Sequence, residues 1–231
     1  SIRYEYGLFK QKIVDGWQIE MPDVWLPGGE SWLIQRSDKH FIVRFDGNVK
    51  ENWTDHGMET VYENAKEIEA IAYDMMVPGK DSDSVSTLRL WRARAVQKFD
   101  MQLFSQGNYA EVMRDDTQAQ LLTKVLYPSD NHYEGKSLRL QQQYFLVSAS
   151  LQCIIADHKR RYGSLALLPQ MAAIHINDTH PALAIPELMR ILMDEEGLGW
   201  DEASWIVQKT VAYTNHTVMS EALERWPEAM M

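Results

Sequence analysis

The sequence predicts an α/β protein with a strand-rich first part, residues 1–95, and a helix-rich second part, residues 96–231. Apolar and polar residues alternate in short runs in the first part, as they do in half-buried strands. In the second part, apolar residues recur at helical spacing. Two short apolar strands there run into polar clusters, and such strand ends line ligand crevices in α/β sheets. We expect residues 1–231 to form a single incomplete domain.

Three alternating runs predict the strands of the first part. They cover residues 40–47, 67–74 and 86–94. The loop 77–84 is rich in turn formers, and a plain connection is favoured over a ligand loop. Residues 1–33 place aromatic residues between Gly and Pro, which predicts short strands and turns packed by large rings. The rings belong to Tyr4, Tyr6, Phe9, Trp17, Trp25 and Trp32.

Two long helices are predicted next, with a polar loop between them. Residues 108–126 carry a thin apolar stripe, so this helix either skims the surface or packs on another subunit. Tyr127-Pro128 ends it. Residues 138–162 are apolar in their middle, which indicates a helix buried against the sheet. The loop 129–136 is either a capped turn or a segment that contacts a ligand.

The last third of the chain alternates strand and helix. Residues 171–176 predict a buried strand, and residues 211–213 predict a return to the sheet. Between them we expect a helix that starts near Ile185 and ends at Gly197, then a second helix capped by Asp201. Both strands end at polar clusters, so the clusters are expected to form one wall of a single pocket.

Composition and charge argue against several classes of function. The formal net charge of −10 disfavours a nucleic-acid-binding surface. No apolar run reaches the ~20 residues of a membrane span. The single cysteine, Cys153, indicates a buried small side chain and a reducing, cytoplasmic setting. Because Ser1 already opens a core-like segment and the chain stops at Met231 without a closing signal, we expect an internal piece of a longer protein.

Four interpretations are open for the polar clusters. A metal site would use their His and Asp side chains, but His175 and His180 lack the helical spacing of the usual zinc site. Catalysis by His and Asp alone lacks a serine nucleophile motif. A pocket for a hydroxylated ligand suits the mixed donors and acceptors, and helix or turn caps are the simplest alternative. The set suited to a sugar is Asp130, Asn131, Asn177, Asp178, His180, Asn215 and His216.

Long motifs match one known family along the whole chain. The most extensive are NDTHPALAIPELMR at 177–190, AYTNHT at 212–217 and EALERWP at 221–227. Shorter ones are IRYEYG at 2–7 and LRLW at 88–91. By these collinear motifs the chain resembles the α-glucan phosphorylases of glycogen, starch and maltodextrin.

The resemblance implies part of the N-terminal Rossmann-like lobe of a two-lobed GT-B glycosyltransferase. This family cleaves α-1,4-glucosidic bonds with inorganic phosphate and releases glucose 1-phosphate. Its pyridoxal phosphate acts through the 5′-phosphate as a proton relay. The cofactor lysine lies in the other lobe, so the chain alone is expected to bind no cofactor or metal and to be inactive.

The resemblance also implies roles for single residues. His216 resembles the histidine against the sugar at the cleavage point, and Asp130 and Asn131 resemble the pair on a gating loop. Together they form the catalytic group, which positions and stabilises a cationic sugar. The helix 108–126 resembles an intersubunit tower, which implies a homodimer. The implied substrate-binding side pocket consists of Arg139, Asp178, His180, Ala222 and Glu224.

Two departures from the family pattern affect these expectations. His132-Tyr133 stands where many members carry two phenylalanines, so gating by this loop is expected to differ. Ala156-Asp157 replaces an arginine pair of AMP-regulated members, and a carboxylate there would repel the nucleotide phosphate. We therefore expect no AMP activation of that kind. The alternatives to a phosphorylase piece are a non-catalytic glucan-binding module and a His/Asp metal-dependent hydrolase.

Overall fold

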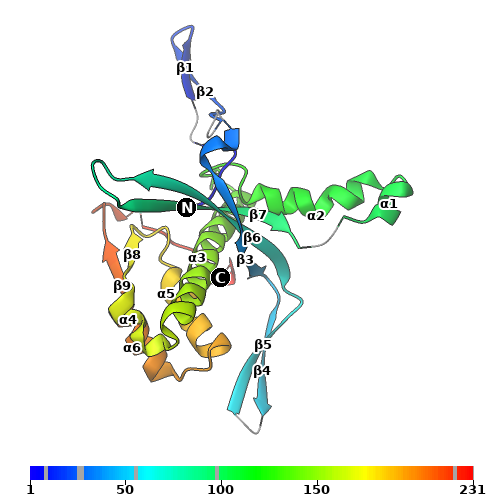
Figure 1. The fold of residues 1–231 in the computed structure, drawn as a ribbon. Coiled ribbons are helices and arrows are strands. Elements are labelled where there is room, and N and C mark those ends of the chain that lie inside the picture. The colour runs from blue at the N-terminus through cyan, green and yellow to red at the C-terminus, as the bar shows by residue number, and fades with distance from the viewer. Residues whose placement is uncertain (8–9, 25–28, 55–56, 97–98, 221–222, 231) are drawn as a thin grey trace. The chain divides into compact units, whose positions relative to one another are not determined.

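The computed structural model describes residues 1–231 except 8–9, 25–28, 55–56, 97–98, 221–222 and 231 (Figure 1). The chain is a mixed α/β protein, with strands mainly in residues 1–95 and helices mainly in residues 96–231, as predicted. It divides into two compact units. The first unit comprises residues 1–45 and 67–142, and the second comprises residues 46–66 and 143–231.

A three-stranded sheet belongs to the first unit. Its strands lie in the order β3 (Ile34–Phe45), β6 (Lys66–Pro78) and β7 (Val85–Ala95), with β6 and β7 antiparallel. They confirm the three predicted strands, and each is longer than its alternating run. The central strand β6 buries consecutive residues from Ala70 to Asp74. Because successive side chains point to opposite faces, both faces of β6 are covered there.

The ring packing predicted for residues 1–33 is wrong at two positions. β1 (Lys10–Val14) and β2 (Trp17–Met21) form an antiparallel hairpin, and Asp15-Gly16 between them has positive φ at both residues, as a type I′ turn requires. Trp17 is 78% exposed and Trp32 is 74% exposed. A two-stranded ribbon has no second layer of its own to cover such rings. The 3-10 turn η1 spans Gly29–Trp32, and Phe9 and Trp25 lie outside the described residues.

The helices of the first unit differ from the prediction at their ends. After α1 (Met101–Ser105), α2 (Tyr109–Leu121) stops at Leu121 rather than at residue 126. Residues beyond it pair with an extended segment instead, since the N–H of Glu5 donates to the Thr123 carbonyl at 3.0 Å. α3 (Tyr133–Tyr162) starts before the predicted residue 138, in the first unit, and continues into the second.

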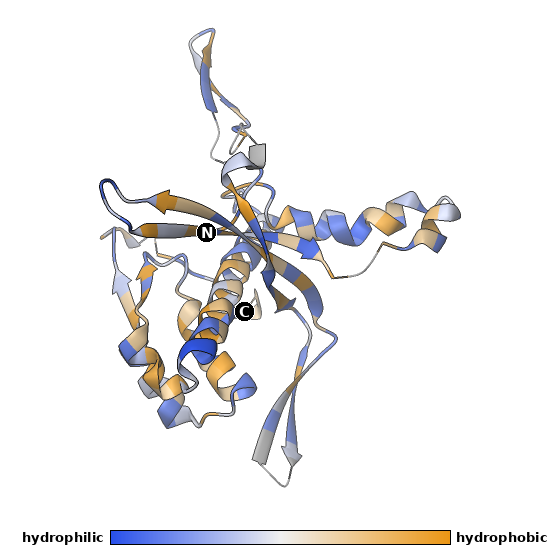
Figure 2. Ribbon diagram, in the orientation of Figure 1, coloured by the Kyte–Doolittle hydropathy of each residue, from blue (hydrophilic) through white to orange (hydrophobic). Residues whose placement is uncertain are grey.

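The second unit surrounds one apolar core that includes Leu151, Leu188 and Ile206. The middle of α3 is largely apolar (Figure 2), and Val147, Leu151 and Ile155 there belong to this core. Besides α3, its elements are the hairpin β4 (Asn48–Thr54) and β5 (Gly57–Glu63), η2 (Leu165–Leu167), α4 (Leu168–Met171), β8 (Ile174–Asn177), α5 (Ala184–Arg190), the π-helical turn η3 (Ile191–Glu195), α6 (Trp200–Thr210), β9 (Val211–Thr214) and η5 (Glu228–Met230).

Most predictions for the second unit are confirmed. β8, β9, α5 and α6 occur where strands and helices were expected. The β4–β5 hairpin was not predicted. The predicted cap of α6 is wrong, because its N-cap is Gly199 and Asp201 lies in the first turn. The negative charge of Asp201 still suits the positive end of the helix dipole at that position.

Tyr62 joins the β4–β5 hairpin to η3 within the second unit. Its hydroxyl donates to Asp194 Oδ2 at 2.5 Å, and the Arg190 guanidinium lies 5.8 Å from its ring centre. We expect Tyr62→Phe to lower the free energy of unfolding by about 1 kcal/mol, because one hydrogen bond is lost. Chemical denaturation measures this. The control is Tyr213→Phe, since Tyr213 is 52% exposed, and an equal loss in both variants would contradict the prediction.

Candidate functional site

The two predicted strand ends lie side by side. β8 and β9 pair in parallel, with Asn177 opposite Thr214 at their carboxyl ends. The N–H of Asp178 extends this ladder by donating to the Thr214 carbonyl at 2.9 Å. Ile176 in β8 is buried and β-branched, which favours a strand and fixes its face. Both polar clusters therefore start from one edge of this strand pair, as predicted.

His216 is held by the end of the neighbouring strand. Its Nε2 hydrogen-bonds to Asn177 Oδ1. Because a carbonyl oxygen only accepts, Nε2 carries the hydrogen, and Nδ1 of the neutral ring is left as an acceptor. A second cross-strand contact joins His175 Nε2 to Thr214 Oγ1 at 2.6 Å. The His216 side chain is exposed, so it is accessible to a ligand.

The turn after β8 fixes the carboxylate of Asp178. Asp178 has a φ of 67°, in the left-handed region that Asp tolerates better than most residues. Its Oδ1 accepts the N–H of Thr179 at 2.7 Å. Further along, His180 Nε2 lies 3.7 Å from Glu224 Oε1, and the Glu224 side chain is only 14% exposed. Ala222, also predicted for this pocket, lies outside the described residues.

The sequence analysis missed a buried ion pair within α5 that also hydrogen-bonds to α3. Glu187 is 3% exposed, and it accepts hydrogen bonds from Arg190 Nε at 2.7 Å and from the Tyr144 hydroxyl at 3.0 Å. Burial, followed by the charge of Glu187, raises the pKa of Tyr144 to about 12. The Glu-x-x-Arg spacing is visible in the sequence. The partner Tyr144 is not, because it lies on another helix.

The remaining predicted residues belong to the first unit. Arg139 Nη1 lies 3.1 Å from Asp130 Oδ2, and the Arg139 guanidinium lies 5.8 Å from the ring centre of Tyr127. Asn131 is exposed beside this pair. The structure thus brings the predicted residues together in two groups, one in each unit. The first group is Asp130, Asn131 and Arg139; the second is Asp178, His180, His216 and Glu224.

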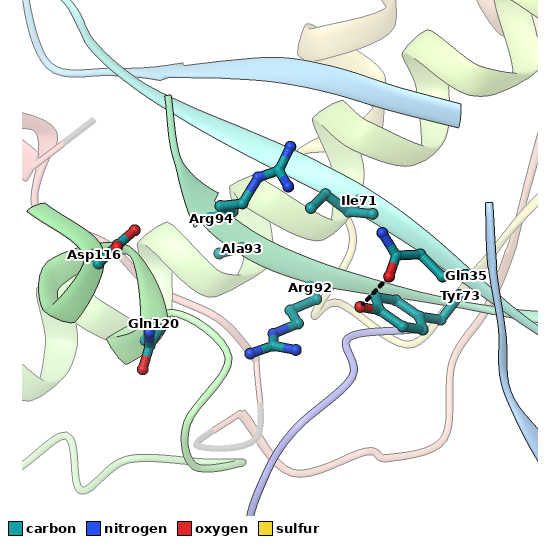
Figure 3. A pocket seen from close by; sticks show the side chains of 8 residues that line it. All are labelled: Gln35, Ile71, Tyr73, Arg92, Ala93, Arg94, Asp116 and Gln120. Carbon is teal, nitrogen blue, oxygen red and sulfur yellow. Dashed lines mark hydrogen bonds between the residues drawn. The ribbon is translucent and has the colours of Figure 1, made fainter. Parts of the chain in front are cut away.

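A cavity of about 310 Å³ in the first unit involves none of these residues (Figure 3). β7 contributes Arg92 and Arg94, and α2 contributes Asp116. On its other side the Tyr73 hydroxyl donates to Gln35 Oε1 at 3.1 Å. This cavity and the predicted sugar site are therefore separate features.

The described residues offer neither a metal-binding cluster nor a membrane-spanning helix. Among them, no group of three or more His, Cys, Asp and Glu side chains is arranged to hold a metal ion. Within the same part of the chain, no helix combines the length and apolar character needed to cross a bilayer.

Comparisons with known proteins point to one family. The family model described as carbohydrate phosphorylase matches residues 1–231. The chain is 50% identical to the glycogen phosphorylase of Pasteurella multocida and 48% identical to that of Haemophilus influenzae, each over 231 residues. It is 47% identical over 238 residues to the brain form of human glycogen phosphorylase. These matches cover 100% of the chain and 28% of each relative.

The chain belongs to the carbohydrate phosphorylase family. The resemblance to glycogen phosphorylases, first seen in the motifs, is confirmed over its full length. The chain spans 28% of the length of these curated relatives.

Proposed function

We propose that the protein carrying this chain is an α-1,4-glucan phosphorylase, to which the chain supplies sugar-binding residues. The observation that carries the proposal is the 47–50% identity to glycogen phosphorylases over the whole chain. The polar edge of β8 and β9 supports it, because imidazole, amide and carboxylate groups match a ring of hydroxyls. The substrates are glucan and inorganic phosphate, the product is glucose 1-phosphate, and the setting is cytoplasmic.

In this proposal each group of polar residues takes the role that the family resemblance implies for it. His216 lies against the glucosyl residue at the cleavage point, and Asn131, with Asp130 beside it on the loop before α3, hydrogen-bonds a sugar hydroxyl. These groups stabilise the cationic transition state by preorganised hydrogen bonds and charges, and none is a nucleophile. Both units belong to one incomplete domain within the N-terminal lobe of a GT-B fold. The side pocket consists of Arg139, Asp178, His180, Ala222 and Glu224.

Pyridoxal phosphate belongs to another part of the parent protein. A Schiff base requires a lysine, and none of the predicted site residues is one. The family resemblance places the lysine that binds the cofactor in the other lobe. When bound elsewhere in the parent, its phosphate supplies proton transfer.

α2 supports a homodimer of the parent. Tyr109, Met113 and Leu121 leave apolar surface exposed along this helix, although its middle is hydrophilic (Figure 2). A second copy of the chain would cover that surface. Sedimentation of the full-length protein tests this, and a stable monomer would contradict it.

The proposal also excludes AMP activation through α3. Asp157 there stands where AMP-regulated members carry an arginine, and its carboxylate, paired with Arg160 Nη2 at 2.9 Å, cannot donate hydrogen bonds to a nucleotide phosphate. Calorimetry on the full-length protein is expected to show no tight AMP binding.

Assay of the full-length protein with maltooligosaccharide and inorganic phosphate tests the main proposal. We expect glucose 1-phosphate from the full-length protein and none from the 231-residue chain, because the phosphate and cofactor residues lie elsewhere. For the isolated chain we expect at best millimolar affinity for maltooligosaccharides, since half of the site is missing. Failure of the full-length protein to form glucose 1-phosphate would overturn the proposal, and tight glucan binding by the chain alone would favour a binding module.

A further inference from the structure

His132 caps the long helix α3 with its imidazole ring. The N–H of Gly135 donates to His132 Nδ1 at 3.0 Å. The N–H of Lys136 donates to the His132 carbonyl at 3.1 Å and forms the first hydrogen bond of the helix. A side chain that accepts the third N–H of a helix acts as its N-cap. Asn, Asp, Ser and Thr usually have this role, so a histidine here is a distinctive choice.

No side chain fits at Gly135 in the capped turn. A Cβ atom at this position would lie 1.7 Å from the Ser129 carbonyl oxygen and 3.0 Å from His132 Cε1. The loop 129–132 is therefore folded directly onto the first turn of α3. The backbone position of this loop and the hydrogen bond from the Gly135 N–H to His132 Nδ1 therefore depend on each other.

The same ring nitrogen has a second partner that competes with the cap. Glu134 Oε2 lies 3.3 Å from His132 Nδ1, and the Glu134 side chain is 83% exposed. A neutral Nδ1 accepts the Gly135 N–H, whereas a protonated Nδ1 has no lone pair and can only donate. Protonation thus exchanges the Gly135 N–H for the Glu134 carboxylate. Histidine is the side chain that changes charge near neutral pH.

The loop fastened by this cap carries the predicted sugar-binding pair. Asp130 is tied to α3 by Arg139, whose Nη1 lies 3.1 Å away. In the described part of the chain, the Asn131 side chain makes no hydrogen bond of its own, so its position follows the backbone at His132. Glu134 is the charged group that contacts the ring, and Asp130, Lys136 and Arg139 are the other charged residues of the same loop and the first turns of α3.

We propose that His132 is a positioning residue whose neutral imidazole holds Asp130 and Asn131 in place for the sugar. Protonation of the ring breaks the hydrogen bond from the Gly135 N–H, and the ring then donates to Glu134 instead. The loop is no longer fixed to the helix. Glucan affinity then weakens at acidic pH through the loop and not through the groups that contact the sugar. This inference rests on the proposed phosphorylase function, but the cap itself is testable without it.

Hydrogen exchange on the full-length protein tests the cap. Wild type and His132→Asn are compared at about pH 8 and about pH 5.5, and exchange is expressed as protection factors so that the different intrinsic rates beside His and Asn are removed. Asparagine caps a helix without changing charge. We expect equal exchange of residues 129–136 at the higher pH and about fivefold faster exchange in the wild type at the lower pH. Equal exchange at both pH values would overturn the proposal.

Kinetics on the same proteins test the positioning role. The quantity compared is the KM for maltooligosaccharide of wild type divided by that of His132→Asn. We expect this ratio to be near one at the higher pH and about three or more at the lower pH. Glu134→Gln removes the partner of the protonated ring and should move the transition to lower pH. A purely structural residue would change KM equally at both pH values, which would overturn the role. Absence of glucose 1-phosphate in wild type would overturn the proposed function, while hydrogen exchange would still decide the cap.

Discussion

Replacing His216 with alanine is expected to lower kcat/KM for glucan phosphorolysis by about 100-fold or more in the full-length protein. The reason is that a preorganised donor or acceptor at a reacting sugar is worth about 3 kcal/mol in the transition state. The ring is exposed, and its Nε2 is already held by Asn177 Oδ1. Removing it deletes a group that contacts the substrate and leaves the apolar core unchanged. Initial rates of glucose 1-phosphate formation measure the effect.

Asn177→Ala is the matched control for His216→Ala. It removes the hydrogen bond that orients the ring but keeps the imidazole, so a smaller loss of kcat/KM is expected. Both variants should unfold at nearly the wild-type denaturant concentration, because neither side chain is buried. Activity of His216→Ala within threefold of wild type would refute its placement at the sugar.

Local patterns in the sequence predicted the elements that place His216. β8 and β9 are short apolar runs, and their parallel pairing sets Asn177 opposite Thr214. The rule that parallel strands end at one edge was enough to bring the two polar clusters together. The His216–Asn177 hydrogen bond follows from that edge, although the sequence alone did not identify this partner.

The sequence analysis did not predict features that depend on contacts between residues far apart in the sequence. The β4–β5 hairpin shows no buried stripe among the side chains whose exposure is described, and it joins the second unit through contacts such as that of Tyr62 with Asp194. The early end of α2 depends on pairing with Glu5 and Tyr6. The exposed rings of Trp17 and Trp32 show the opposite error, because aromatic content alone does not supply a covering layer.

Asp74 in β6 carries a buried charge that two arginines of the first unit compensate. It is fully buried, and Arg89, its cross-strand partner, donates from Nε and Nη2 to its two oxygens at 2.7 Å. Arg36 Nη1 adds a third bond at 2.9 Å. We expect Asp74→Ala to lower the free energy of unfolding by about 3 kcal/mol, since two guanidinium groups lose their counter-charge. This value is at the lower end for buried ion pairs because both arginines remain partly exposed.

Urea denaturation of full-length wild type and Asp74→Ala measures that loss. Asp38→Ala is the matched control, because Asp38 is a partner of the same Arg36 at 2.7 Å but lies at the exposed surface. It should shift the denaturation midpoint far less. Similar shifts of the midpoint for the two variants would show that burial of Asp74 does not increase the contribution of its ion pairs to stability.

The pH dependence of stability provides a separate test of the same ion pair. Burial by itself would raise the pKa of Asp74, but the hydrogen bonds and charges of Arg89 and then Arg36 outweigh it and hold this pKa below its ordinary value. An unfolded Asp titrates near ~4, so around that pH the unfolded chain binds more protons than the folded one. The contribution of Asp74 is therefore complete above about pH 5 and is lost as pH falls through its folded pKa. The difference in unfolding free energy between wild type and Asp74→Ala should shrink below about pH 4, and a constant difference there would contradict the assignment.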